Sequence, residues 1–302
     1  MEPPSLTVMV CTLDRDPIPG RLRYEWVRRM FPDANVVHVT DDLPQEPSAH
    51  RDFWTLWRDA CLRAAGGPVD YVFASEAYGP TLAEVLGARY VEVDRPRELV
   101  PVSGTLVRSN PMRYWDFIPE PVRPYFVKRV CVFGPESTGK STLARDLARH
   151  FRTVYAWEYA RPLLDPAGGQ CTPEDIPRIA RGQVAAEDAL AYQANRVLFC
   201  DTDVLTTTLW SEVLFGDTPQ WVRDLAEQRR YDLYLVTDVD VPWVDDRQRF
   251  FSDETVRRQM FERFLSAVQS RGRPHRVIRG DWRQRFAAAC EAVRALIGPV
   301  QE

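Results

Sequence analysis

The run Gly134-Pro-Glu-Ser-Thr-Gly-Lys-Ser141 constrains the fold of this chain more than any other segment. The apolar run VCVF precedes it and the amphipathic stretch TLARDLARHF follows it, so the glycines lie where a strand gives way to a helix. Glycines let the backbone curl until successive N–H groups face one point, and the helix dipole adds positive character there. The spacing GxxxxGK[ST] therefore predicts a phosphate-binding P-loop in a parallel α/β unit.

Two side chains of this loop suit a nucleotide. Lys140 is expected to reach the β and γ phosphates of ATP, and Ser141 to ligate Mg²⁺. Of the 39 basic residues only Lys128 and Lys140 are lysines, and a compact ammonium is not interchangeable with a guanidinium at such a site. The predicted ATP site consists of Gly134, Glu136, Ser137, Thr138, Gly139, Lys140, Ser141 and Thr142.

Length and composition describe an ordinary folded chain. Its 302 residues, 45% hydrophobic and 27% charged, suffice for two domains. A formal net charge of -4 disfavours a general nucleic-acid binder, which needs an excess of Lys and Arg. The apolar runs fall far short of the ~20 residues of a membrane helix, and the N-terminus lacks a signal-peptide pattern. We expect a cytoplasmic protein with no nucleic-acid or membrane partner, and its oligomeric state, homo-oligomers included, stays open.

Two α/β patterns follow one another along the chain. Short β-rich runs alternate with helical stretches, which predicts parallel sheets. Residues 118–127 carry three prolines in ten positions and are expected to form a stiff connector. We predict an α/β fold with two parallel-sheet domains, residues 1–127 and 128–302. The strands are expected at 7–13, 35–40, 70–75 and 89–94, then at 128–134, 153–157, 196–201, 231–238 and 275–280.

Acidic residues follow two of the predicted strands. Asp201 ends the apolar run VLFC, at the edge where parallel sheets bind ligands, and is a candidate for holding Mg²⁺ or a substrate hydroxyl. Asp203, two residues on, is either a substrate contact or a helix N-cap. Glu158 follows the run TVYAW and is the candidate catalytic base, with a helix start as the alternative.

Neighbouring residues suit substrate binding. Trp157 would either stack on a flat aromatic substrate or belong to the core. Arg161 would pair with Glu158 or hold a phosphate. In the segment 243–250, Arg247 and Arg249 are candidates for a lid that clamps the transferred phosphoryl group, with a solvated loop as the alternative.

Taken together, these segments resemble the bifunctional nicotinamide-mononucleotide adenylyltransferase/ribosylnicotinamide kinase family, often called NadR-like, over nearly the whole chain. The resemblance of the second half lies in GPESTGKST, AWEYAR at 156–161, FCDTD at 199–203 and WVDD at 243–246. It implies that Trp157 stacks on the nicotinamide ring and that Glu158 and Asp201 serve as base and magnesium ligand. The remaining substrate and lid residues that it implies are Tyr159, Arg161, Asp203, Arg247 and Arg249.

The first half resembles the adenylyltransferase part of that family, a nucleotidyltransferase-like Rossmann domain. The similarity lies in VCTLDRDPIPGRLRYEWVRRMFP, QEPSAHRDFWTLW and SGTLVR, and the last of these implies that Ser103, Thr105 and Arg108 contact ATP phosphates. Helix capping is the alternative for the two hydroxyls. The family's GxFxPxHxGH loop is missing, since His38, His50, His150 and His275 form no HxGH pair. We therefore expect an incomplete domain that lacks its first strand and this loop.

Four hypotheses for the function remain. The leading one is an ATP- and Mg²⁺-dependent kinase that phosphorylates the small-molecule substrate nicotinamide riboside in NAD salvage. A bifunctional enzyme would also adenylylate the mononucleotide, with the missing loop encoded upstream. A nucleotide-responsive sensor of NAD metabolism would bind ligand in a relic first domain. A generic nucleoside or shikimate-type kinase is the fallback.

Overall fold

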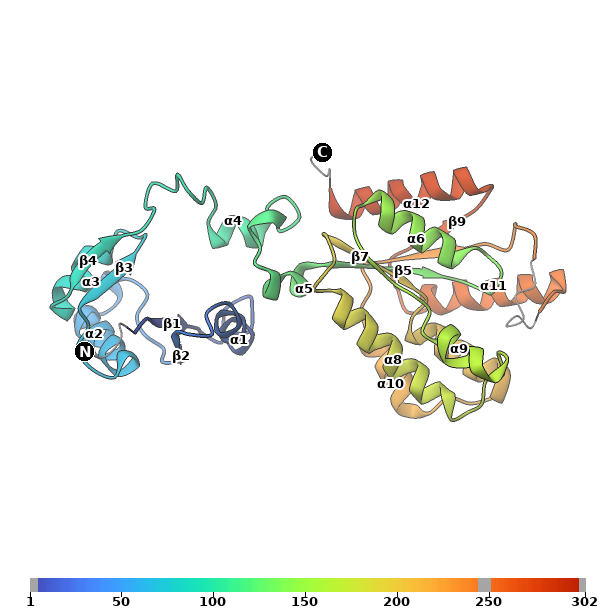
Figure 1. The fold of residues 1–302 in the computed structure, drawn as a ribbon, viewed down its shortest axis with the longest axis horizontal. Coiled ribbons are helices and arrows are strands. Elements are labelled where there is room, and N and C mark those ends of the chain that lie inside the picture. Colours follow the sequence, from blue (N-terminus) through green and yellow to red (C-terminus); the bar gives the residue numbers. More distant parts are fainter. Residues whose placement is uncertain (1–4, 244–250, 299–302) are drawn as a thin grey trace. The chain divides into compact units, whose positions relative to one another are not determined.

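The computed structural model describes residues 5–243 and 251–298, and the chain divides into two compact units, Met1–Ser109 and Asn110–Glu302 (Figure 1). This division lies before the proline-rich segment that we expected to end the first domain. That segment forms the 3₁₀ helix η3 (Glu120–Val122) and the short helix α5 (Arg123–Phe126). Upstream of it, the main-chain oxygen of Met112 accepts a 3.0 Å hydrogen bond from Arg196 of the second unit. Residues 110–126 therefore belong with the second unit.

The first unit contains two parallel strand pairs, each joined by a helix. The four predicted strands form, but they make two two-stranded sheets, because β1 and β3 are not paired in the described part of the unit. Helix α2 packs against β1, β2 and α3 and so holds the two pairs together. The elements are β1 (Thr7–Cys11), α1 (Gly20–Met30), β2 (Asn35–Val39), η1 (Pro47–Ala49), α2 (Phe53–Ala65), β3 (Tyr71–Ala74), α3 (Gly79–Leu86), β4 (Arg89–Glu92) and α4 (Gly104–Ser109).

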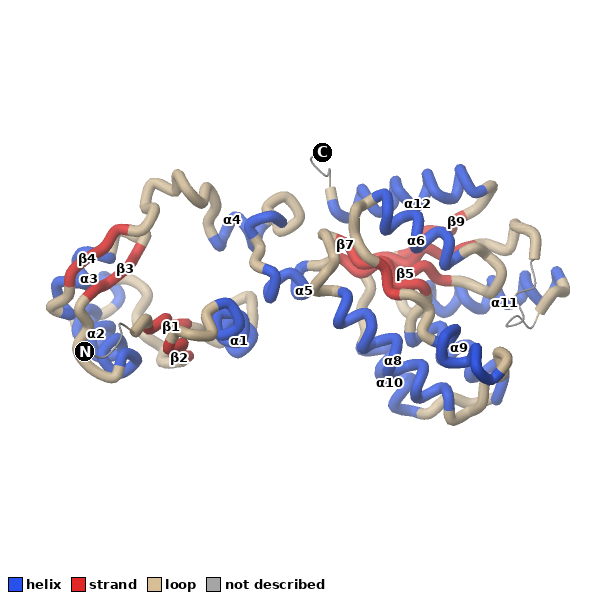
Figure 2. The backbone as a smooth tube through the Cα atoms, in the orientation of Figure 1, coloured by secondary structure: helices blue, strands red, loops and turns tan. Residues whose placement is uncertain are grey.

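The second unit is built on one five-stranded parallel sheet with the order β6-β7-β5-β8-β9 (Figure 2). All five predicted strands form here, so the predicted α/β class with parallel sheets is confirmed. The strands are β5 (Lys128–Phe133), β6 (Tyr155–Ala156), β7 (Val197–Asp201), β8 (Leu233–Thr237) and β9 (His275–Ile278). The helical elements besides η3 and α5 are η2 (Trp115–Phe117), α6 (Lys140–His150), α7 (Ala160–Leu164), η4 (Asp165–Ala167), α8 (Asp175–Leu190), α9 (Val204–Phe215), α10 (Gln220–Gln228), α11 (Glu254–Gln269) and α12 (Trp282–Ile297).

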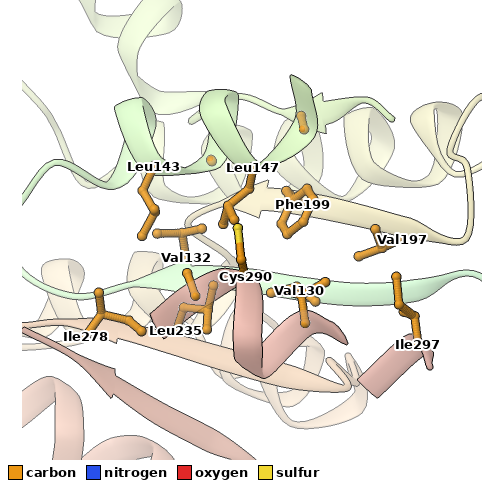
Figure 3. Packing of buried hydrophobic residues seen from close by; sticks show 14 residues of the cluster. Val130, Val132, Leu143, Leu147, Val197, Phe199, Leu235, Ile278, Cys290 and Ile297 are labelled. Atoms are coloured by element: carbon orange, nitrogen blue, oxygen red, sulfur yellow. The ribbon is translucent and has the colours of Figure 1, made fainter. Parts of the chain in front are cut away.

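Helices cover both faces of this sheet. Helices α6 and α12 lie on one face, and α8, α9 and α11 lie on the other (Figure 1). The first face buries a cluster that includes Val130, Val132, Leu147 and Val293 (Figure 3). On the opposite face Phe133 packs against Phe264 of α11, with ring centroids 4.9 Å apart. Burial on both faces explains why the strands read as continuous apolar runs, and each such side chain contributes about 1.5–3 kcal/mol.

The parallel register brings the functional segments to one edge of the sheet. Val132 of β5 lies opposite Asp201 of β7 and Leu235 of β8, so the P-loop begins beside the ends of both neighbouring strands. The carboxyl ends of parallel strands are where α/β sheets bind ligands. Within residues 5–243 and 251–298, no helix has the length and apolar character that crossing a membrane requires.

Candidate functional site

The P-loop adopts the backbone that its sequence predicts. Its turn carries positive φ values at Gly134 (139°), Ser137 (56°) and Gly139 (79°), and α6 then starts at Lys140. A Cβ atom on Gly134 would collide with Thr237 of β8, and one on Gly139 would collide with the indole ring of Trp282. Both glycines are therefore required by close approach as well as by conformation.

Side chains within the loop hold its shape. The hydroxyl of Thr138 donates a 2.8 Å hydrogen bond to the Pro135 oxygen and shares a 2.7 Å hydrogen bond with the Thr237 hydroxyl. Lys140 Nζ also donates to the Pro135 oxygen, at 2.7 Å. Burial lowers the pKa of Lys140, and the charges of Glu158 and Asp201 oppose that shift. The ammonium group is thus poised in a buried site that anionic phosphates would stabilise.

Asp201 lies beside this loop with unsatisfied hydrogen-bonding capacity. Its side chain is 1% exposed, and its Oδ1 atom has no hydrogen-bond partner in the described part of the chain. Burial, followed by the charge of Glu158, raises the pKa of Asp201 to about 6, while Lys140 and a hydrogen bond with Ser141 oppose this. A buried, orphaned carboxylate oxygen next to a serine hydroxyl fits a magnesium site whose other ligands come from phosphate and water.

Asp203 is engaged elsewhere. Its Oδ1 atom accepts hydrogen bonds from the main chain (2.8 Å) and hydroxyl (3.0 Å) of Thr206, which caps α9. Its Oδ2 atom accepts a 2.9 Å hydrogen bond from the Tyr234 hydroxyl. Because both oxygens are occupied and the side chain is buried, the geometry favours the N-cap interpretation of Asp203 over the substrate contact.

A cavity of about 100 Å³ lies between α7, α8 and α9. The predicted residues Glu158 and Arg161 line it, and Arg161 Nε donates a 3.0 Å hydrogen bond to Glu158 Oε2. Thr202 also lines the cavity, and its main-chain N–H donates a 3.1 Å hydrogen bond to the Val132 oxygen of β5, so the cavity adjoins the P-loop. The charge of Glu158 raises the pKa of both Lys140 and Asp201. The residues lining it are Glu158, Ala160, Arg161, Leu164, Cys171, Ile176, Ile179, Gln183, Thr202, Thr206, Thr207, Trp210 and Leu214.

Sequence reasoning missed the wall that α9 contributes. Thr206, Thr207 and Trp210 lie on this helix and line the cavity. The signal was available, because the run TTTLW follows the acidic strand end and places hydroxyls and an indole one helical turn apart. The Trp210 ring also stacks on Phe251, with centroids 6.1 Å apart and planes 4° apart.

Besides Asp203, two further residues predicted to bind substrate do not line this cavity. Trp157 is 59% exposed and does not line the cavity. The ring of Tyr159 packs against Gly182 of α8, and its main-chain N–H donates a 3.0 Å hydrogen bond to Gln183 Oε1. Neither the solvent-exposed indole nor the packed tyrosine ring contacts the cavity. The lid residues Arg247 and Arg249 lie outside the described residues.

A second cavity, of about 630 Å³, opens beside the P-loop. Gly139 and Thr142 of the predicted ATP site line it, together with residues of α12 that the sequence did not single out. Among these, Trp282 lies directly over Gly139. The cavity walls are Thr138, Gly139, Thr142, Leu143, Asp146, Trp282, Arg283, Arg285 and Phe286.

The first unit has its own cavity, of about 210 Å³. Arg108 and Trp57 line it. The hydroxyl of Ser103 accepts a 3.2 Å hydrogen bond from Leu106 N, and that of Thr105 accepts one of 3.2 Å from Arg108. Ser103 therefore acts as a local cap, and Arg108 alone of the three predicted phosphate contacts reaches the cavity.

Comparisons with known proteins agree with this architecture. The model of an AAA domain family matches residues 129–285. The trifunctional NAD biosynthesis/regulator protein NadR of Escherichia coli K12 is 32% identical over 292 residues, 93% of this chain and 70% of that protein. NadR of Salmonella typhimurium LT2 is 32% identical over 286 residues, 91% of this chain and 70% of that protein.

A solved structure shares the fold over nearly the whole chain. A crystal structure of a NadR protein in complex with NR superimposes with a TM-score of 0.77 and 23% identity, covering 99% of this chain and 90% of that one. With such coverage by a shared fold, and with 32% identity to the enterobacterial proteins, this chain belongs to the NadR family.

Proposed function

We propose that the second unit transfers the γ-phosphoryl group of ATP to the 5′-hydroxyl of nicotinamide riboside, giving nicotinamide mononucleotide and ADP in NAD salvage. The observation that carries the proposal is the position of Glu158, which lines a small cavity and acts electrostatically on Lys140 and Asp201 beside the P-loop. A donor held by the P-loop and an acceptor held in this cavity would meet at these three charged groups. The family membership and the NR complex of a related NadR protein support the same choice of substrate.

In the proposed reaction, the acceptor oxygen forms a bond to the γ phosphorus as the bond to the bridging oxygen of ADP breaks. Glu158 takes the proton of the attacking hydroxyl. Lys140 leaves its hydrogen bond to the Pro135 oxygen and neutralises charge on the β and γ phosphates. Arg247 and Arg249 remain the proposed lid cations.

We propose that Ser141 and Asp201 hold Mg²⁺. When bound there, the ion would supply charge neutralisation at the phosphate oxygens. The unpartnered Oδ1 atom of Asp201 supports this assignment. Few protein ligands are expected, because Mg²⁺ usually keeps several waters and binds through one or two carboxylates plus substrate phosphates.

The acceptor cavity suits a flat, charged ring. The pyridinium of nicotinamide riboside is cationic, and an indole face attracts cations that lie within about 6 Å. Trp210 contributes its indole to the cavity wall, whereas Trp157, the residue implied by the family resemblance, is exposed to solvent. Thr206 and Thr207 offer hydroxyl groups beside it for the ribose.

Kinase assays test this function. We expect ATP-dependent phosphorylation of nicotinamide riboside that exceeds that of adenosine, uridine and shikimate. Removing a group that stabilises transition-state charge typically costs 10²–10³-fold in kcat, and removing a general base costs roughly 10²–10⁴-fold. We expect the loss in kcat to fall in the first range for Lys140→Ala and in the second range for Glu158→Ala. A substrate panel led by another nucleoside would overturn the choice of acceptor, and undiminished activity in either variant would remove that residue from the mechanism.

The cavity of the first unit favours a second function, the binding of a pyridine nucleotide. Arg108 lines it with Trp57, which combines a cation for phosphate with an aromatic wall, and Arg23 lines it as well, paired with Asp16 at 2.6 Å. Titration of NAD and nicotinamide mononucleotide into an Arg108→Ala variant tests this, since weaker binding with unchanged kinase activity would locate the nucleotide in the first unit. Equal affinity of the parent and of Arg108→Ala for these nucleotides would exclude that location.

A further inference from the structure

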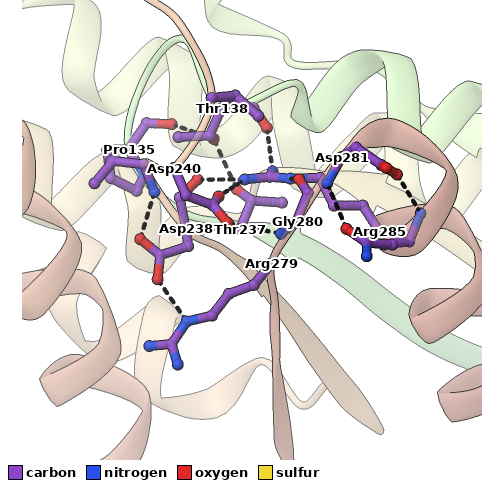
Figure 4. Close-up of polar contacts among 12 residues, drawn as sticks. Pro135, Thr138, Thr237, Asp238, Asp240, Arg279, Gly280, Asp281 and Arg285 are labelled. Atoms are coloured by element: carbon purple, nitrogen blue, oxygen red, sulfur yellow. Dashed lines mark hydrogen bonds and ion pairs between the residues drawn. The ribbon is translucent and has the colours of Figure 1, made fainter.

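A buried arginine of α12 links the P-loop to the segments that follow β8 and β9. Arg285 is 1% exposed and bonds to four acceptors on three separate segments (Figure 4). Its Nη1 atom donates a 3.0 Å hydrogen bond to the main-chain oxygen of Thr138 in the P-loop. Its Nη2 atom donates to the main-chain oxygen of Asp238 at 2.9 Å and to the Asp240 carboxylate. Its Nε atom donates to the Gly280 oxygen at 2.8 Å.

The bond to Thr138 fixes a peptide group that faces the phosphate site. Trans peptide units are planar and carry their C=O and N–H groups on opposite sides, and the described chain has no cis peptide bond. With the Thr138 oxygen directed to Arg285, the N–H of Gly139 is directed away from α12. Gly139 lies between the P-loop turn and the first residue of α6, where N–H groups bind phosphate.

The acceptors of Arg285 are themselves held in place. The carboxylate of Asp238 accepts hydrogen bonds from Arg258 of α11 (2.8 Å) and from Arg279 after β9 (2.7 Å). Asp240 accepts a 2.6 Å hydrogen bond from the main-chain N–H of Gly280. The guanidinium thus sits in a frame built from the ends of β8 and β9, and a planar fork of donors suits such a frame better than a point charge.

We propose that Arg285 is a positioning residue for the donor nucleotide, which presents the Gly139 N–H to the phosphates by holding the Thr138 carbonyl. The inference deepens the proposed kinase function and rests on it for the identity of the donor. It adds a residue that lies 147 positions after Thr138 and acts through the Thr138 peptide group. Its effect is therefore expected on binding of the donor phosphates, while the acceptor cavity, lined by α8 and α9, stays unchanged.

The test compares nucleotide affinity in the full chain without riboside. We expect Arg285→Ala to weaken binding of ATP and ADP at least tenfold, as measured by calorimetric titration, and to raise KM for ATP with KM for nicotinamide riboside within twofold of the parent. Arg285→Lys keeps a charge but cannot span the four acceptors, so its ATP affinity should lie between those of the parent and Arg285→Ala. The matched control is Arg273→Ala, since Arg273 is also buried and bonds to the Ala226 oxygen and the Tyr234 hydroxyl, away from the P-loop.

The outcomes separate the two proposals. Parent-like ATP affinity in Arg285→Ala would overturn the positioning role, and so would an equal loss in Arg273→Ala, which would indicate general destabilisation. If Arg285→Ala does not fold, Arg285→Lys decides, because parent-like ATP affinity in that variant would refute the need for a fork of donors. If the parent binds ATP, Arg285→Ala binds it more weakly, and the parent does not phosphorylate nicotinamide riboside, only the proposed acceptor is refuted.

Discussion

The main-chain N–H of Phe251 donates a 2.6 Å hydrogen bond to Oε1 of Glu136. Glu136 lies in the P-loop, and Phe251 is the first described residue after the predicted lid. The Phe251 ring in turn stacks on Trp210 in the wall of the cavity that we propose for the acceptor. One residue therefore contacts both the P-loop and the wall of the cavity between α7, α8 and α9.

Replacing Glu136 should weaken this link. Glu136→Ala removes a charged acceptor from the Phe251 N–H, and hydrogen bonds to charged groups are worth about 1.5–3 kcal/mol. We expect KM for ATP and for nicotinamide riboside to rise together, each roughly tenfold, in steady-state kinetics. Glu254→Ala, at the exposed start of α11, is the control. A change in KM for ATP alone would contradict the link.

The stability of the protein should depend on Asp201 in a defined pH window. Its folded pKa of about 6 exceeds the ordinary value of 3.8 because the group is buried. Between these pH values the folded state binds more protons than the unfolded state, so the free energy of unfolding falls as pH rises through the window. Without Mg²⁺, we expect the free energy of unfolding of Asp201→Asn to exceed that of the parent by up to about 3 kcal/mol at pH 7.5. Near pH 4 the two free energies should be equal.

Urea unfolding with a chelator at both pH values measures this difference. The variant should lose kinase activity even though it is more stable, because an amide replaces the carboxylate that we propose as the magnesium ligand. If Asp201→Asn is less stable than the parent at pH 7.5, the carboxylate stabilises the fold and its pKa is not raised.

The Mg²⁺ concentration should determine the pH at which kcat/KM falls on the acid side of its pH profile. Only the ionised Asp201 carboxylate is a good metal ligand, so kcat/KM is expected to fall below about pH 6 at low Mg²⁺. A bound cation favours the ionised form, and saturating Mg²⁺ should therefore shift this limb to lower pH. The pH profile at several Mg²⁺ concentrations measures it, and a limb that stays in place would exclude Asp201 as the ligand.

The two candidate tryptophans should differ in their effect on the riboside. Trp210 lines the cavity and Trp157 is 59% exposed. Stacking on an aromatic ring contributes about 0.5–1.5 kcal/mol beyond buried area, and a desolvated cation over a tryptophan adds more. We expect Trp210→Ala to raise KM for nicotinamide riboside roughly tenfold or more, and Trp157→Ala to raise it less. The reverse order would restore the assignment that the family resemblance implies.

Gly182 should be intolerant of a side chain. A Cβ at this position would meet the Tyr159 ring, which packs on the helix next to Glu158. Overpacking costs typically 1–3 kcal/mol, so Gly182→Ala should lower stability by about that amount in urea unfolding. In the double variant Gly182→Ala/Tyr159→Ala the two costs should not add, because the clash is gone. Full additivity would show that the two residues do not interact.

Much of the second unit was predictable because its signals are local. The spacing of the P-loop glycines fixes a turn between strand and helix, and alternating strands and helices dictate a parallel sheet whose carboxyl edge collects Lys140, Glu158 and Asp201. The sequence could not decide between the two alternatives for Asp203, a helix N-cap and a substrate contact. Its N-cap role depends on Thr206 nearby and on the Tyr234 hydroxyl, which β8 supplies from 31 residues away.

Other features are decided by tertiary packing. The sequence alone determined the fold class, the phosphate loop and the acidic strand ends, because backbone conformation and hydrophobic pattern depend on neighbours along the chain. Only the folded structure places Trp210 in the cavity wall, leaves Trp157 in solvent and aims Arg285 at Thr138. Each of these features depends on residues distant in sequence. Whether a side chain meets a cavity, solvent or a carbonyl is set by how the helices pack on the sheet.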